Sequence, residues 1–126
     1  LPQNITWAMP GMVPNTEVLT FFKNKPVDCF INVSSSEGLP VSIMEAISFG
    51  IPVLSTDVGG CNEIVNEQTG QLIPLNTPTA EIALIIEKIE SSNMNTPEFR
   101  RGVRGFWQDN FEIHKNYKVL FDIIEK

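Results

Sequence analysis

The sequence predicts a three-layer α/β fold, with helices on both faces of a parallel sheet. Residues 27–33 form a nearly continuous apolar run, which is typical of a parallel strand covered on both faces. From that run onward, short apolar segments alternate with segments of helical periodicity, which is the order expected of consecutive β-α-β units. The segments are separated by Gly or Pro, which end helices and begin turns.

Composition limits the classes of function. The chain has 126 residues, of which 42% are hydrophobic and 19% charged, which suits one globular domain with a core of its own. Its formal net charge of -6 argues against a nucleic-acid surface, because such surfaces need many cations to neutralise phosphates. No apolar run approaches the roughly twenty residues that span a bilayer. The chain begins at Leu1 without a signal region, so we expect an excised piece of a longer protein.

Local signals fix the expected elements. Pro40 and Pro78 suit first helical positions, and Gly50 suits the residue after a helix. Thr77 is expected to cap the helix that Pro78 begins, with its buried face formed by Ile82, Ile85, Ile86 and Ile89. In chain order we expect a strand at 4–9, a helix at 14–24 capped by Asn15 or Thr16, a strand at 27–33, a helix at 40–49, a strand at 51–55, a helix at 61–66, a strand at 71–75, a helix at 77–89, a polar loop at 91–95, and helices at 97–110 and 112–125.

The stretch from Ser34 to Gly60, SSSEGLPVSIMEAISFGIPVLSTDVGG, has the residues whose choice looks dictated by chemistry. If a helix begins at Pro40, its first amides point out unpaired together with the positive end of the helix dipole, which favours an anion. Those amides belong to Val41, Ser42 and Ile43. Glu37 lies in the loop before this helix, and Glu45 follows seven residues later on its flank.

A ligand with a phosphate in its middle and hydroxyl groups at both ends would fit this layout, because carboxylates accept hydrogen bonds from hydroxyls. A nucleotide sugar is such a ligand. The plainer interpretation is two solvated carboxylates near a helix start, where negative charge is favoured. For Gly38, Gly59 and Gly60 the plainer interpretation is turn chemistry, and both interpretations can hold together.

The remaining chemistry-bearing residues favour no other active site. No cluster of carboxylates suggests a metal, and none of the Lys or Arg residues lies between positions 34 and 60. The Arg100, Arg101 and Arg104 cluster is best interpreted as a solvated helix face. Cys29 suits a small core residue, while Cys61 suits a reduced thiol in the cytoplasm. The sole histidine lies far from the serine cluster at 34–36, which argues against a serine hydrolase.

In combination these motifs resemble a known family. The apolar strand, the Glu-x7-Glu motif with its EA, G-x-PV and GG continuation, and then NEIV and LIPL are similar to the carboxyl-terminal, nucleotide-binding domain of retaining GT-B glycosyltransferases of group 1. The likeness extends from Ile5 through Phe121. It implies a Rossmann-like α/β/α domain that forms most of one half of a GT-B fold, with residues 1–126 as the donor domain. Residues 111–126 would pack as a helix toward the acceptor domain.

The resemblance also implies roles for individual residues. Glu37 matches the glutamate near the donor sugar, and is the expected catalytic residue. Glu45 matches the glutamate that accepts hydrogen bonds from the ribose. The loop that holds the distal phosphate corresponds to Gly38, Leu39, Pro40 and Val41, and the segment that lines the base includes Gly11 and Met12.

The implied activity is transfer of a sugar from a nucleotide diphosphate with retention of configuration, without a cofactor or metal. The acceptor, a sugar or a lipid-linked one, would be bound mainly by an amino-terminal domain that is missing here, as are the usual Arg and Lys phosphate clamps. The fragment alone is therefore expected to have weak or no turnover. The family implies a protein of the cytoplasm, either free there or bound peripherally at the inner face of the membrane. It is expected to bind no nucleic acid and to have no transmembrane segment. The alternative is a non-catalytic α/β binding or interaction module. The sequence leaves the base, the sugar and the acceptor open.

Overall fold

The computed structural model describes residues 3–112, and the helix expected at 112–125 lies outside these residues apart from its first position. Three short strands form one sheet in the order β1-β2-β3, and neighbouring strands run parallel. Phe30 of β1 pairs with Val53 of β2, which in turn pairs with Gly70 of β3. The elements are α1 (Asn15–Asn24), β1 (Phe30–Asn32), α2 (Val41–Ser48), β2 (Val53–Thr56), α3 (Cys61–Ile64), β3 (Gly70–Ile73), α4 (Thr79–Ile89), the 3₁₀ turn η1 (Asn93–Asn95) and α5 (Pro97–Asn110).

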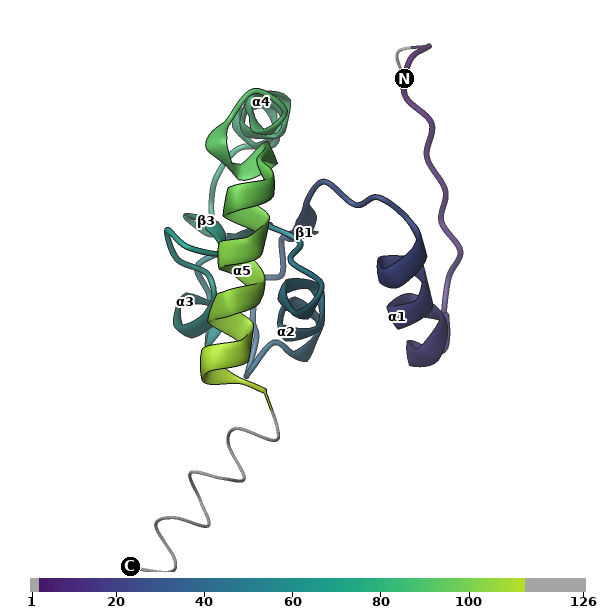
Figure 1. Cartoon of the computed structure of the whole chain (residues 1–126). Coiled ribbons are helices and arrows are strands. Elements are labelled where there is room, and N and C mark those ends of the chain that lie inside the picture. The colour runs from purple at the N-terminus through teal and green to yellow at the C-terminus, as the bar shows by residue number, and fades with distance from the viewer. Residues whose placement is uncertain (1–2, 113–126) are drawn as a thin grey trace, which may run out of the picture.

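Helices cover both faces of the sheet, so the predicted three-layer α/β fold is confirmed. Val53 and Leu54 are adjacent on β2, so their side chains point to opposite faces. Val53 packs in a buried cluster with residues of α2, α3 and α5, including Ile47 and Val103. Leu54 packs in a second cluster with Ile89 of α4. Figure 1 shows α5 lying beside α2 and α3, with α4 away from α2 and α3.

Helix α1 lies beside this body and joins it through aromatic contacts (Figure 1). The ring of Phe22 is 6.2 Å from that of Phe30 and 5.9 Å from that of Phe49. The helix starts after Pro14, whose carbonyl accepts from the Glu17 amide over 3.0 Å, and no side chain caps it. The expected caps, Asn15 and Thr16, are therefore wrong: both lie inside the helix, beyond the capping position.

The strand expected at 4–9 is not formed. These residues run as an extended, exposed trace past α1 (Figure 1), and no backbone hydrogen bond pairs them with another described residue. A strand exists only where a neighbour accepts and donates its backbone bonds, so β-rich composition alone leaves the segment extended. For the same reason the run 27–33 pairs over only Phe30–Asn32.

Two proline positions and one hydrophobic stripe also differ from the expectation. Pro40 and Pro78 each immediately precede a helix as its N-cap residue, so neither is the first helical residue. No side chain caps α4, and the Thr77 hydroxyl donates to the Pro74 carbonyl over 2.6 Å. On α4, Ile89 is buried and Ile82 and Ile85 are half-buried, whereas Ile86 is 42% exposed. The expected loop at 91–95 contains η1, and α5 has the predicted bounds.

Candidate functional site

The loops after β1 and β2 meet at the carboxyl edge of the sheet, where Glu37 and Gly38 lie. The Gly60 amide donates to the Gly38 carbonyl over 2.9 Å. Gly59 has a φ of +51° and approaches the Glu37 carbonyl so closely that a Cβ on it would overlap that oxygen. The second loop therefore supports the first through backbone contact, and a sequence interpretation as plain turn glycines misses this contact.

A polar network fixes the start of the first loop to the ends of the strands. The Thr56 hydroxyl donates to the Ser34 carbonyl over 2.7 Å, and the Ser34 hydroxyl donates to Oδ1 of Asn32 over 2.7 Å. Nδ2 of Asn32 lies 3.5 Å from Oγ of Ser55. Thr56 and Ser55 are both buried, so these hydrogen bonds satisfy polar groups that water does not reach.

The loop then passes into α2 at Pro40, which is buried. The Pro40 carbonyl accepts from the amides of Ile43 and Met44 over 3.1 and 3.2 Å. Ile43 was expected to leave its amide unpaired, and this is wrong, because the first turn is tightened by that bond. The amides of Val41 and Ser42 have no backbone acceptor among the described residues. Gly38, Leu39 and Val41 are exposed around this helix end, so a ligand could reach it.

Glu37 lies in the loop before α2 and Glu45 lies within α2, and both are half-buried. Glu37 belongs to the loop that Gly59 contacts, whereas Glu45 is held on α2. The side-chain amide of Asn15 of α1 lies 3.2 Å from each carboxylate oxygen of Glu45. We assign its nitrogen to that side, because its oxygen would face only acceptors there, and the nitrogen then donates to both oxygens. The sequence interpretation assigned Asn15 to a helix cap and so missed this contact.

Gly11 and Met12, the residues expected near the base, precede α1. Gly11 adopts a φ of +75° with open space around it, and Met12 is fully exposed. The structure joins their segment to α2 through Asn15, three residues further along. Their assignment to the base stays a prediction.

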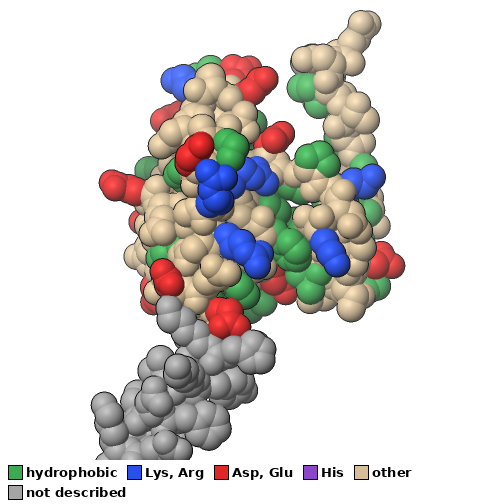
Figure 2. Space-filling model, viewed as in Figure 1, with side chains coloured by type: hydrophobic (Ala, Val, Ile, Leu, Met, Phe, Trp, Pro, Cys, Tyr) green, Lys and Arg blue, Asp and Glu red, His purple; other side chains and the backbone are tan. Residues whose placement is uncertain are grey.

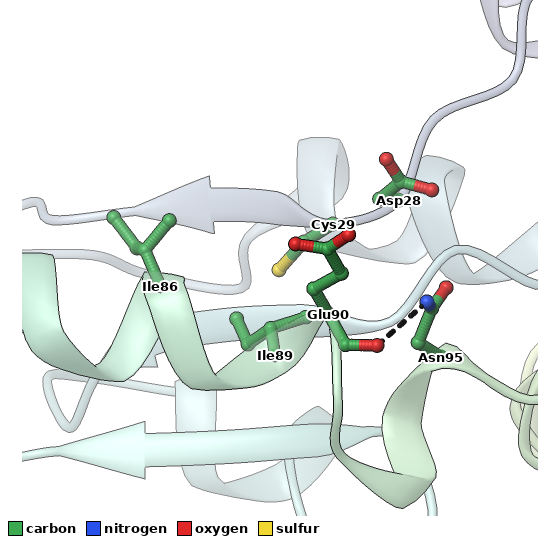
Figure 3. Close-up of a pocket in the computed structure, with 6 residues that line it drawn as sticks. All are labelled: Asp28, Cys29, Ile86, Ile89, Glu90 and Asn95. Carbon is green, nitrogen blue, oxygen red and sulfur yellow. Dashed lines mark hydrogen bonds between the residues drawn. The ribbon is translucent and has the colours of Figure 1, made fainter.

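The hollow at the other end of the sheet does not involve these residues. It has a volume of about 410 Å³ and lies between the start of β1 and the end of α4, where Asp28, Cys29, Ile86, Ile89, Glu90 and Asn95 line it (Figure 3). Burial raises the pKa of the Cys29 thiol to about 11, so the thiol stays protonated near neutral pH. An inert thiol and an Asn95 side chain already bonded to the Glu90 carbonyl over 2.9 Å give this hollow no evident chemistry.

Lys and Arg side chains gather over α5 in Figure 2. Two of the three arginines there do more than cover a solvated face. The Arg100 side chain donates to the Val27 carbonyl and the Arg104 side chain to the Ser48 carbonyl, each over 2.9 Å. Arg104 thus meets the last turn of α2, where cations are favoured, while Arg101 pairs with Glu98 over 3.6 Å at the surface.

Within residues 3–112 no three His, Cys, Asp or Glu residues are grouped as metal ligands would be.

These features define an α/β domain with a candidate anion site at the carboxyl edge of its parallel sheet. Comparison with protein families gives the class: residues 3–102 match the family model for glycosyl transferases group 1, and the chain belongs to that family.

Individual relatives agree with this assignment. A Bacillus subtilis protein described as a candidate teichuronic acid biosynthesis glycosyltransferase is 32% identical over 110 residues, covering 87% of this chain and 28% of that protein. An O-antigen biosynthesis glycosyltransferase of Escherichia coli is 46% identical over 57 residues, covering 45% of this chain and 17% of that protein. The chain therefore spans less than a third of the length of these relatives.

A solved structure supports the fold. Sucrose-phosphate synthase of Thermosynechococcus elongatus superposes with a TM-score of 0.68 at 21% identity, covering 90% of this chain and 30% of that one. At this identity the likeness shows the fold alone, and it confirms the predicted half of a GT-B architecture. Among the described helices, none has the length and apolar content needed to cross a membrane.

Proposed function

We propose that this chain is the donor-binding domain of a retaining glycosyltransferase that transfers a sugar from a nucleotide diphosphate to an acceptor. The observation that supports it best is the exposed start of α2, where the amides of Val41 and Ser42 have no backbone acceptor among the described residues, with Glu37 in the loop before it and Glu45 on the helix. Membership of the glycosyl transferases group 1 family supports the same assignment.

Each part of the donor has a chemical counterpart in this arrangement. Glu45 accepts hydrogen bonds from the ribose hydroxyls, and Glu37 accepts from hydroxyls of the sugar. The amides of Val41 and Ser42, with the loop at Gly38 and Leu39, hold the distal phosphate at the positive end of the helix. Gly11 and Met12 line the base.

The reaction follows from these positions. The bond between the anomeric carbon and the diphosphate oxygen breaks, and its electron pair stays on the nucleoside diphosphate. The acceptor hydroxyl oxygen forms the new bond to that carbon from the same face, and its proton passes to the departing diphosphate. Amides fixed at the start of α2 stabilise the negative charge that grows on this leaving group, where preorganised donors contribute most to catalysis. The acceptor is bound mainly outside these residues, and the chain alone turns over weakly or not at all.

A titration of this chain with UDP and with GDP tests the donor site. Relatives whose names specify UDP sugars include an Escherichia coli UDP-Gal:α-D-GlcNAc-diphosphoundecaprenol α-1,3-galactosyltransferase, 35% identical over 100 residues, so UDP is the first probe. We expect Glu45→Ala to lose more than about 1 kcal/mol of binding free energy, the size of one ordinary hydrogen bond. Glu87→Ala is the matched control, because Glu87 is exposed on α4.

Absence of binding at millimolar UDP and GDP would favour a non-catalytic module instead. The complete encoded protein separates that outcome from a donor site that needs further residues. If it neither hydrolyses nor transfers from any nucleotide sugar in a panel, the enzymatic assignment is wrong.

A further inference from the structure

Two adjacent glycines, Gly59 and Gly60, touch the backbone of the Glu37 loop. The Gly60 amide donates to the Gly38 carbonyl over 2.9 Å, and a Cβ built on Gly60 would lie 2.7 Å from the same oxygen. A Cβ built on Gly59 would overlap the Glu37 carbonyl oxygen. Both clashes are with main-chain atoms, which cannot rotate away as the end of a side chain can.

The first loop is held at both ends, so it can yield only between them. Ser34 at its start accepts the Thr56 hydroxyl over 2.7 Å, and Pro40 at its end is buried and accepts the first amides of α2. A side chain at position 59 or 60 would therefore displace Glu37 and Gly38 themselves. Glu45 lies on α2, beyond this held segment, and contacts Asn15 of α1.

We propose that Gly59 and Gly60 are positioning residues that set the place of Glu37, and so the recognition of the donor sugar, while leaving Glu45 in place. The role assigned to Glu37 rests on the proposed function, but the backbone contact does not. The loop after β2 thus acts on the sugar end of the donor through the loop after β1.

The first experiment measures the loop in the full chain without ligand. Amide hydrogen exchange at position 60, whose amide donates to the Gly38 carbonyl, is compared in wild type, Gly59→Ala and Gly60→Ala. We expect exchange there to rise at least tenfold in both variants, while the amides of β2 stay protected. Because Gly60 has no positive φ and a milder clash than Gly59, Gly60→Ala keeps the test open if Gly59→Ala does not fold.

Two glycines elsewhere provide matched controls. A Cβ on Gly70 would overlap the Val53 carbonyl in the sheet, so Gly70→Ala introduces the same kind of clash away from Glu37. A Cβ on Gly105 of α5 would meet nothing within 4 Å. If exchange at position 60 rises no more in Gly60→Ala than in Gly70→Ala, the proposed positioning role is wrong.

The second experiment asks whether the glycines act through Glu37. In the complete encoded protein, with UDP-galactose and UDP-N-acetylglucosamine as probes, we expect Gly60→Ala to lower kcat/KM about tenfold. Adding Gly60→Ala to Glu37→Gln should then cost less than twofold, because the positioned group is already impaired. Full additivity would overturn the positioning role. A wild type inactive with both probes would count against the proposed donor, whereas the exchange experiment would still decide the contact.

Discussion

The contact between Asn15 and Glu45 joins α1 to the candidate site, and its energy can be isolated. With its side-chain nitrogen assigned toward α2, Asn15 donates to both carboxylate oxygens of Glu45 over 3.2 Å. Asn15→Asp replaces this donor with a second carboxylate. Two unit charges about 4 Å apart repel by about 1 kcal/mol in water and about 4 kcal/mol at an effective dielectric of about 20. Because Asn15 is exposed and Glu45 half-buried, we expect a value near the lower end, about 1–2 kcal/mol.

A double-mutant cycle is needed, because an acid in the first turn of α1 is itself favoured by about 0.3–1 kcal/mol. Asn15→Asp is therefore measured in wild type and in Glu45→Gln, and the helix contribution cancels in the difference. Urea unfolding followed by circular dichroism gives the free energies of unfolding. We expect a coupling of about 1–2 kcal/mol that shrinks at about 1 M salt, where charges are screened within about 3 Å. A coupling below about 0.3 kcal/mol, the scatter of independent sites, would refute the contact.

Three further predictions concern the body of the domain. Ile47→Ala should lower the free energy of unfolding by about 2–5 kcal/mol, because Ile47 is buried. Ile86→Ala, at a 42% exposed position, should lower it by under about 1 kcal/mol. Equal urea midpoints for the two variants would contradict the core assignment. Thr96→Ala removes the hydroxyl that accepts the Phe99 amide over 3.2 Å at the start of α5 and should cost about 0.5–2 kcal/mol, while Thr77→Ala should cost less in the same assay. The pKa of Cys29 is raised from 9.0 to about 11 by burial, so the folded state keeps a proton that the unfolded state loses, and stability should fall as pH rises from about 9 to about 11. Urea midpoints across that window should slope less in Cys29→Ala, and an unchanged slope would show that Cys29 is not the group responsible.

Much of the architecture could be predicted from the sequence because it depends on local pattern. The run around Phe30 and the helical periodicity of 97–110 each indicate their element without help from distant residues, and α5 has the expected bounds. Where the prediction was wrong, a contact distant in sequence decided the outcome. Residues 4–9 have the composition of a strand, but strand formation requires a partner, and none is present among the described residues.

The candidate site likewise has a part that local sequence pattern predicts and a part that depends on contacts distant in sequence. Glu37, Glu45 and the helix start that separates them follow from spacing and from Pro40, and the structure places Glu37 in the loop after β1 and Glu45 on α2. The contacts that hold them were not predictable from spacing. Asn15 lies thirty positions before Glu45, and its residue type suits a helix cap equally well.

The two glycines show why residue type alone could not assign a role. A positive φ at position 59 would also be satisfied by a turn with nothing behind it, as at Gly11, where the space beyond the Cα is open. Gly59 differs because a backbone carbonyl occupies the space where its Cβ would be, and that carbonyl belongs to Glu37. Turn geometry would tolerate Asn at such a position, but the contact with Glu37 would not. A Gly59→Asn variant that kept the Gly60 amide protected from exchange would therefore show that the turn, and not the contact, requires glycine.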